Sequence, residues 1–124
     1  MNQDVATLQG MYDGFNARDI DRVLAALADD VAWANGMEGG YEHGREALRA
    51  YWTRQWALVS PRLHPLYFDK RADGSILVTA KQAIRDLAGR PLQDEGFGLQ
   101  DKVVGHVFHF ADGRVTRFDI EAAP

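Results

Sequence analysis

Three polar side chains stand in stretches whose alternating pattern is otherwise apolar. His106 alternates with Val104 and Phe108, and its imidazole takes up or releases a proton near neutral pH. Asn35 and Gln82 carry amides that can orient a carbonyl or hydroxyl oxygen of a ligand. We therefore take His106 as the candidate catalytic acid or base and the two amides as ligand-binding groups. The alternative is that each side chain satisfies a buried backbone group or a neighbouring side chain.

Aromatic side chains accompany these polar groups. Trp52 and Trp56 are four residues apart and face one direction on a helix, where they either stack on a flat ligand or pack in the core. Polar groups that converge in an apolar cavity are typical of ligand sites, so we expect these residues and His106 to line one cavity. The predicted ligand-binding residues are Tyr12, Trp33, Asn35, Trp52, Trp56, Gln82, Phe108 and Phe118.

No metal site and no cofactor are predicted. His106 and His109 are three residues apart in a strand, so their side chains point to opposite faces and cannot bind one ion together. The chain contains no cysteine, which excludes thiolate nucleophiles and cysteine zinc sites. Glu38, Glu42 and His43 form a polar cluster in a glycine-rich segment, either as a solvated surface or as a lid over the pocket.

The first half of the chain has the periodicity of helices. Residues 2–17 have one apolar face, made of Val5, Leu8, Tyr12 and Phe15. Asp19 caps a short second helix that Asp29 and Asp30 end, with an inner face of Ile20, Val23, Leu24 and Leu27. Residues 31–35 alternate like a strand, and residues 36–40 are a glycine-rich loop. A third helix over residues 44–60 has an inner stripe of Leu48, Trp52, Gln55, Trp56 and Val59.

From Arg62 onward the apolar period changes from 3.6 to 2. Turn signals at residues 72–74, 88–91 and 111–113 divide this part into four strands of an antiparallel meander. One face of the second strand carries Ile76, Val78, Ala80, Gln82 and Ile84, and one face of the third carries Val104, His106, Phe108 and Phe110. The predicted fold class is α+β, with three N-terminal helices closing one side of a long curved antiparallel sheet.

Length and composition fit a single domain over residues 1–124, with 46% apolar and 26% charged residues. The net charge is −4 and the basic residues do not gather in a stripe, so nucleic acid is not an expected partner. No apolar run approaches the length of a membrane span, and residues 1–10 lack the pattern of a secretory signal. We therefore expect a cytoplasmic protein that makes no membrane contact.

Three stretches carry a family resemblance: DGFNARDIDRVLAALADDVAW at residues 13–33, GREALRAYWTRQW at 44–56 and HVFHFADGRVTRFDI at 106–120. With the order of the elements, they resemble the nuclear-transport-factor-two-like superfamily and, within it, the SnoaL-like and ketosteroid-isomerase-like branch. The resemblance extends from about residue 5 to residue 120. It implies a cone-shaped curved antiparallel sheet with three N-terminal helices enclosing a pocket. The superfamily includes isomerases, cyclases, dehydratases, epoxide hydrolases and non-catalytic binding modules.

The catalytic residues of the known enzymes transfer poorly onto this chain. The proton-shuttling Asp of ketosteroid isomerases falls on Asn35, whose amide cannot take a proton from carbon at neutral pH. Their oxyanion-hole Tyr falls on Met11, one place before Tyr12, and their protonated Asp falls on His106. The Asp-Arg-Asp relay of limonene-epoxide-hydrolase-like members has no counterpart at the inward strand positions unless Asp119 faces inward through a bulge.

We therefore expect a pocket protein that binds a small apolar or aromatic metabolite. One alternative is an enzyme, namely an isomerase, dehydratase or cyclase that uses His106 as acid or base. The other is a non-catalytic ligand-binding or dimerisation module of the same fold. A homodimer is expected through the convex sheet face, where an apolar patch otherwise meets water at Leu77, Thr79, Val107 and His109.

Overall fold

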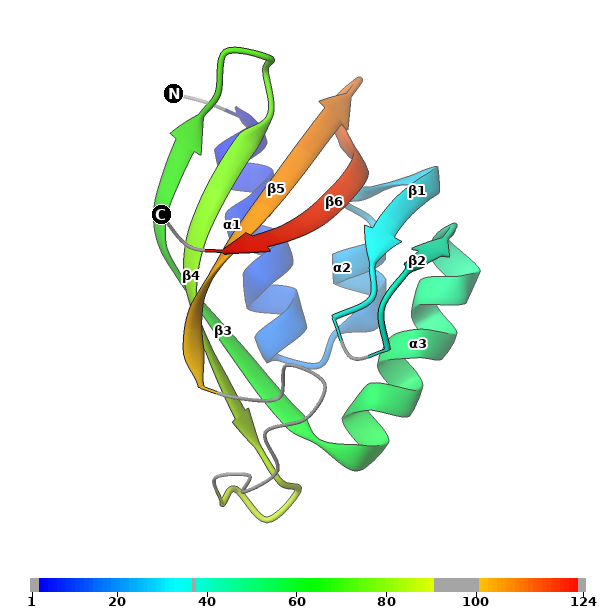
Figure 1. Ribbon diagram of the computed structural model, residues 1–124. Coiled ribbons are helices and arrows are strands. Elements are labelled where there is room, and N and C mark those ends of the chain that lie inside the picture. The colour runs from blue at the N-terminus through cyan, green and yellow to red at the C-terminus, as the bar shows by residue number, and fades with distance from the viewer. Residues whose placement is uncertain (1–2, 37, 91–100, 123–124) are drawn as a thin grey trace.

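The computed structural model describes residues 3–36, 38–90 and 101–122. The elements are α1 (Gln3–Asn16), α2 (Ile20–Leu24), β1 (Leu27–Ala34), β2 (Tyr41–His43), α3 (Arg45–Leu58), β3 (Ser60–Lys70), β4 (Ile76–Arg85), β5 (Lys102–Ala111) and β6 (Arg114–Ala122). The predicted α+β architecture, with three helices ahead of a meander, is confirmed (Figure 1).

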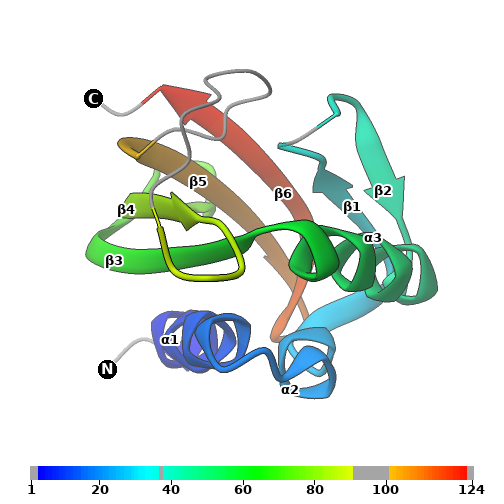
Figure 2. The ribbon, with the colours of Figure 1, turned by 90° about the horizontal axis from the view of Figure 1, so that it is seen from below.

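The described strands form one sheet in the order β2-β1-β6-β5-β4-β3. Neighbouring strands are antiparallel except β1 and β6, which are parallel. The sheet is strongly curved, and α1 and α3 lie on its concave side (Figure 2). This arrangement confirms the cone-shaped sheet and the helices that close it. No helix within the described ranges has the length and apolar character needed to cross a membrane.

Polar side chains fix the helices relative to the sheet. At the end of α1, Asn16 donates to the backbone oxygen of Leu63 at 2.7 Å and accepts from its N–H at 2.9 Å. At the start of α3, Arg45 donates two hydrogen bonds to the backbone oxygen of Leu27. Asp19 caps α2 as predicted, because its carboxylate accepts a backbone N–H of the first turn. Both long helices are thus held at defined places over the sheet.

The segment after α2 differs from the prediction. β1 begins at Leu27, so Asp29 and Asp30 lie inside a strand instead of ending a helix. The cause is tertiary, because β1 pairs with β6, and the register shift between Leu27 and Ala32 accompanies two exposed acidic side chains. Residues 41–43, which lie outside the predicted elements, form β2.

The turns of the meander follow the sequence signals. Gly74 and Gly113 have positive φ angles of 90° and 78° in the turns that lead into β4 and β6, as those predicted turns require. The predicted turn at residues 88–91 follows β4, and its Gly89 has a positive φ angle of 87°. Its last residue, Pro91, lies outside the described residues.

Alternate residues of β4, β5 and β6 form the concave face of the sheet. His106 pairs with Val78 on one side and with Ile120 on the other. Gln82 is four residues from Val78 on the same strand and therefore faces the same way. The predicted faces of these two strands are confirmed, and both polar side chains point toward the helices.

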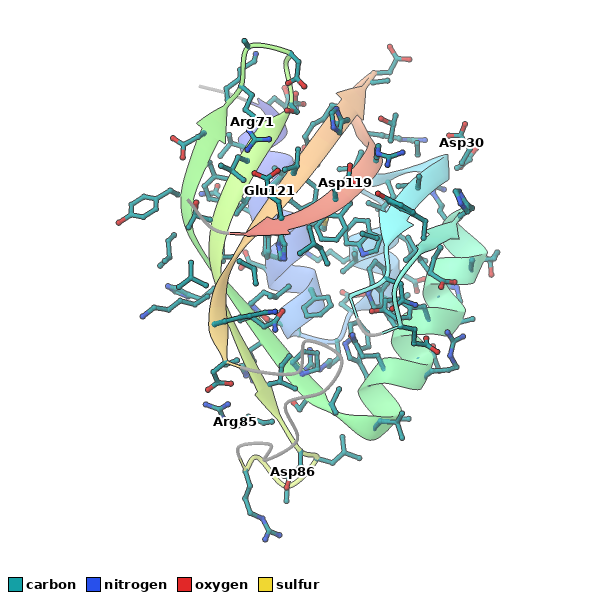
Figure 3. The ribbon with its side chains drawn as sticks, in the orientation of Figure 1. Asp30, Arg71, Arg85, Asp86, Asp119 and Glu121 are labelled. Atoms are coloured by element: carbon teal, nitrogen blue, oxygen red, sulfur yellow. The ribbon has the colours of Figure 1, made fainter. Side chains whose placement is uncertain are left out.

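The convex face does not offer the expected apolar patch to water. Leu77, Thr79 and Val107 are only 8%, 9% and 5% exposed in the single chain. Arg71 forms an ion pair with Glu121 across this face (Figure 3). The expected patch is therefore wrong at these three positions, because buried side chains and a charged pair occupy the face.

Candidate functional site

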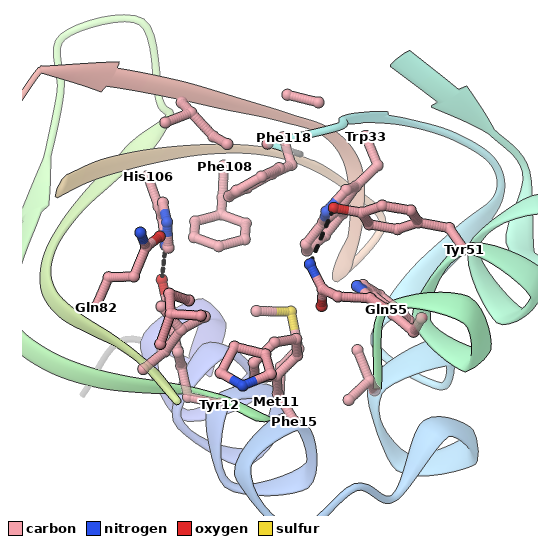
Figure 4. Close-up of a pocket in the computed structure, with 18 residues that line it drawn as sticks. Met11, Tyr12, Phe15, Trp33, Tyr51, Gln55, Gln82, His106, Phe108 and Phe118 are labelled. Atoms are coloured by element: carbon pink, nitrogen blue, oxygen red, sulfur yellow. Dashed lines mark hydrogen bonds between the residues drawn. The ribbon is translucent and has the colours of Figure 1, made fainter. Parts of the chain in front are cut away.

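An apolar pocket lies between α1, α3 and the concave face of the sheet (Figure 4). Its cavity volume is about 90 Å³. It adjoins a second hollow of about 350 Å³, with which it shares Ala34, Gly36, Gln82 and Ile120. The described residues that line the inner pocket include no Asp, Glu, Lys or Arg. A charge brought into this pocket loses its water without gaining an oppositely charged side chain.

Seven of the nine candidate site residues line this pocket, namely Tyr12, Trp33, Trp52, Gln82, His106, Phe108 and Phe118. They come from six elements of the fold, so the pocket exists only when the helices and the sheet are assembled. Asn35 and Trp56 do not line it. That the seven residues bind a ligand stays a prediction.

A buried hydrogen-bonded pair is formed in the pocket by side chains of α1 and β5. The hydroxyl oxygen of Tyr12 lies 2.7 Å from Nδ1 of His106 (Figure 4). Both side chains are almost fully buried, at 1% and 4% exposure. Their rings are nearly parallel, at 9°, and their centroids are 6.0 Å apart. Helix α1 therefore directs the Tyr12 hydroxyl to the imidazole.

Burial sets the charge state of this pair. Desolvation lowers the pKa of His106 from 6.5 to about 4 and raises the pKa of Tyr12 well above its usual value. Both groups are therefore neutral at pH 7. Nε2, the second ring nitrogen of His106, makes no hydrogen bond to the residues that the structure describes. Depending on the tautomer, Nε2 offers a ligand either an N–H donor or a lone pair.

Aromatic rings build the wall beside this pair. Trp33 and Phe118 stack with centroids 4.0 Å apart, and Trp33 meets Trp52 edge to face at 5.3 Å. Phe118 also contacts His106 edge to face, at 4.9 Å. Such ring pairs are rigid and mutually supporting, so the wall serves the core and the pocket at the same time.

Trp56 lies outside the pocket, contrary to expectation. Its ring is parallel to that of Trp52, with centroids 6.2 Å apart, and packs edge to face on Phe15 at 5.3 Å. The guanidinium carbon of Arg18 lies 5.2 Å from its centroid and covers the outer side. Trp56 therefore belongs to the packed corner where α1, α3 and β3 meet.

Asn35 lines the outer hollow and holds the loop between β1 and β2. Its Oδ1 accepts the backbone N–H of Glu38 at 2.8 Å, and its Nδ2 donates to the carboxylates of Glu38 and Glu42 at 3.3 and 3.1 Å. The expected place in the inner pocket is wrong because these nearer partners draw the amide into the loop. Both glutamates therefore bond to Asn35, and the side chain of Glu38 is also 65% exposed, as expected for a solvated surface.

We expect Asn35→Ala to lower the free energy of unfolding by about 1–2 kcal/mol, because the partly buried N–H of Glu38 loses its acceptor and the loop loses the amide donor. Urea denaturation measures the change. Affinity for a pocket ligand is expected to stay within about twofold of wild type. A variant of unchanged stability and much weaker binding would instead make Asn35 a ligand contact.

The comparisons with known proteins agree with this fold. The model of the SnoaL-like domain matches residues 8–118. The chain belongs to the SnoaL-like domain family. This SnoaL-like chain is 28% identical to an NTF2-like protein of unknown function from Burkholderia pseudomallei, with a TM-score of 0.80 over 99% of this chain and 92% of that one. No curated protein sequence matches it.

Two further solved structures share the fold of the SnoaL-like chain. TerC, co-crystallised with polyporic acid, is 22% identical with a TM-score of 0.80 and covers 98% of this chain and 92% of its own. RV0760c from Mycobacterium tuberculosis, in complex with estradiol-17β-hemisuccinate, is 14% identical with a TM-score of 0.79 and covers 99% and 95%. At these identities the likeness concerns the fold alone.

Gln55 and Tyr51 of α3 line the pocket of the SnoaL-like domain and are absent from the predicted site. Nε2 of Gln55 donates to the Tyr51 hydroxyl at 3.2 Å (Figure 4). The sequence pattern could have placed Gln55 in the site, because Gln55 is a polar residue among the apolar residues of the inner stripe of the third helix. Among the described residues of the SnoaL-like domain, no group of three or more His, Asp or Glu side chains is placed to bind a metal ion.

Proposed function

We propose that this SnoaL-like protein binds an apolar ring compound through a carbonyl or hydroxyl oxygen and that His106 and Tyr12 exchange protons with it. The observation that carries the proposal is the buried, neutral Tyr12–His106 pair at one end of a pocket whose described lining residues include no Asp, Glu, Lys or Arg. A neutral polar pair at such a place is matched by an oxygen atom of a ligand that is largely apolar.

The walls and the volumes favour a flat ring compound. Trp33, Phe108 and Phe118 present rings to the pocket. A dry cavity of about 150 Å³ holds one benzene molecule, whereas the inner cavity measures about 90 Å³. A ligand with one or two rings therefore fills the inner pocket and also needs part of the outer hollow, which supplies about 350 Å³ more.

The neutral pair suits chemistry that moves a proton without creating a charge. When Nε2–H gives its proton to a ligand oxygen, Tyr12 passes its own proton to Nδ1 and takes one from the ligand in return. The ligand has then moved a proton from one of its atoms to another, and both side chains remain neutral. Isomerisation, dehydration and aldol-type cyclisation each need such a transfer. In the apolar pocket a charged intermediate is costly, which favours this coupled route.

The structural neighbours support the choice of ligand class. TerC was crystallised with polyporic acid and RV0760c with estradiol-17β-hemisuccinate, and both compounds contain aromatic rings. A pocket with aromatic walls in the same fold is expected to accept compounds of related shape. The comparison bears on shape only, since the residues that contact the ligand differ from protein to protein.

Binding of 2-tetralone, a ketone of two fused rings, tests the proposal by isothermal titration calorimetry. We expect a dissociation constant below about 1 mM, as ordinary ligand efficiency gives for this size. Ile120→Trp fills the junction of the two hollows and is expected to abolish binding. Leu58→Trp, at a position that is 67% exposed on α3, is the matched control. Equal binding by both variants would contradict the proposed site.

Binding without turnover is the second candidate function, and one observation favours it. A histidine whose pKa is about 4 is a weak base at neutral pH, and the described lining residues provide no carboxylate to replace it. In that case His106 only donates a hydrogen bond to the ligand. The two functions differ in whether a bound ketone exchanges protons with water.

Dimerisation through the convex face is a separate proposal. Half-buried His109 and the exposed ion pairs of β6 remain available for contact there, although Leu77 and Val107 are buried in the single chain. Sedimentation velocity at tens of micromolar protein tests it. A monomer at that concentration would contradict the proposal.

A further inference from the structure

Gln55 leaves a buried hydrogen-bond acceptor without a partner. Its Nε2 donates to Tyr51, whereas its Oε1 is buried and has no hydrogen-bond partner among the described residues. Unpaired acceptors are rare inside proteins, because the oxygen has lost water and gained nothing. An unpaired acceptor at the wall of a cavity is explained when a bound ligand donates a hydrogen bond to it.

The position of Gln55 gives the pocket two polar ends. Figure 4 shows Gln55 and Tyr51 of α3 on one side and His106 with Tyr12 on the other. Met11 and Phe108 lie between the two ends in this view (Figure 4). A ligand whose first oxygen is at His106 therefore reaches α3 with the opposite edge of its ring system.

We infer that Gln55 is a specificity-determining residue that accepts a hydrogen bond from a hydroxyl group at the far end of the ligand. The inference rests on the proposed function and narrows its ligand class to ring compounds with oxygen at both ends. Since Nε2 is already engaged by Tyr51, the atom left for the ligand is an acceptor. A carbonyl oxygen there would repel Oε1, whereas a hydroxyl group donates to it.

Charged ligand groups do not fit this end. The described lining residues include no cation to balance a carboxylate or phosphate beside Gln55. An ammonium group would lose its hydration for one neutral acceptor. A neutral hydroxyl or phenol is therefore the matching group.

A pair of ligands that differ in one hydroxyl tests the inference. 2-Tetralone carries the carbonyl alone, and 6-hydroxy-2-tetralone adds a hydroxyl on the far side of the second ring. Calorimetric titration of wild type is expected to give about threefold to tenfold tighter binding of the hydroxylated compound, the usual contribution of one hydrogen bond. In Gln55→Leu this preference is expected to fall to about onefold, while the affinity for 2-tetralone stays within about twofold. Gln9→Leu makes the same change at an exposed position of α1 and is expected to keep the preference.

The thermal stability of the ligand-free protein separates a specificity role from a structural one. Gln55→Leu removes an unpaired acceptor but also the hydrogen bond from Nε2 to the Tyr51 hydroxyl, so the two effects offset and the midpoint of thermal unfolding is expected to change little. A large fall would assign Gln55 to structure instead and overturn the inference.

The binding outcomes are distinguishable. If 2-tetralone binds with no preference for the hydroxylated compound, the role of Gln55 is contradicted and the proposed function stands. If the preference survives in Gln55→Leu, another residue recognises the hydroxyl and the inference is equally contradicted. If neither compound binds wild type, the proposed function fails and the inference fails with it.

Discussion

Replacing His106 by glutamine is expected to slow protein-catalysed deuterium exchange next to the 2-tetralone carbonyl by ~10²–10⁴, the usual share of a general acid or base. Glutamine retains a hydrogen-bonding amide of similar reach, so the affinity for 2-tetralone is expected to change by less than about tenfold. Because the proton transfer needs an imidazole that gains and loses protons, this variant is expected to lose exchange rate while it keeps most of its affinity. Proton NMR in D₂O measures the exchange, and calorimetry measures the affinity.

His109→Gln is the matched control for this experiment. It makes the same chemical change three residues along β5, at a half-buried position outside the pocket lining. Exchange is expected to continue at the wild-type rate. Tyr12→Phe keeps the imidazole but removes the hydroxyl at 2.7 Å, and it is expected to slow the exchange as well, since the coupled transfer loses its second proton.

Two results would change the assignment. A wild-type protein that binds 2-tetralone and never accelerates the exchange would leave ligand binding as the function of the pocket. Exchange that persists unchanged in His106→Gln would place the acid or base elsewhere. Either result leaves the size and polarity of the pocket as described.

Acid is expected to destabilise the wild-type protein through His106. The unfolded chain protonates this histidine near pH 6.5, whereas burial lowers the folded-state pKa to about 4. Between these values the unfolded state holds more protons, so the free energy of unfolding decreases as the pH falls. The loss begins near pH 7 and is complete below about pH 4, where it amounts to about 3 kcal/mol.

Urea denaturation from pH 7.5 to pH 4.5 measures this loss. His106→Gln lacks the titrating group and is expected to lose about 2 kcal/mol less than wild type over the range, whatever its stability at pH 7.5. The difference between the two proteins isolates His106 from the carboxylates, which both proteins share. Parallel curves would show that the imidazole is not kept neutral by burial.

The sequence predicted best what depends on local periodicity. The faces of β4 and β5 follow from alternation, so Gln82 and His106 could be placed on one side of the sheet without knowing their neighbours. The stripe of α3 likewise oriented Trp52 toward the pocket. Trp56 lies on the same stripe, but it packs against Arg18 and Phe15. No local sequence pattern predicts these two contacts.

Local sequence patterns could not predict the contacts between segments that are distant in the chain. Tyr12 and His106 are 94 residues apart in the chain, and their hydrogen bond depends on how α1 crosses the sheet. The parallel pairing of β1 with β6 is equally non-local and moved the start of β1 to Leu27. In Asn35 the deciding contacts are instead local. Its partners Glu38 and Glu42 are close in sequence, and they hold its amide in the loop and away from the inner pocket.

The place of β6 in the sheet governs the order in which the fold can form. β6 follows the other strands along the chain, yet it lies between β1 and β5 and is the only described strand that joins β1 to the meander. In a nascent chain that ends before β6, no pairing of the described strands joins β1–β2 to β3–β4–β5. The stacked rings of Trp33 and Phe118 meet only when β6 docks. Synthesis therefore completes the pocket in a late, long-range step, which slows folding relative to a meander of sequential hairpins.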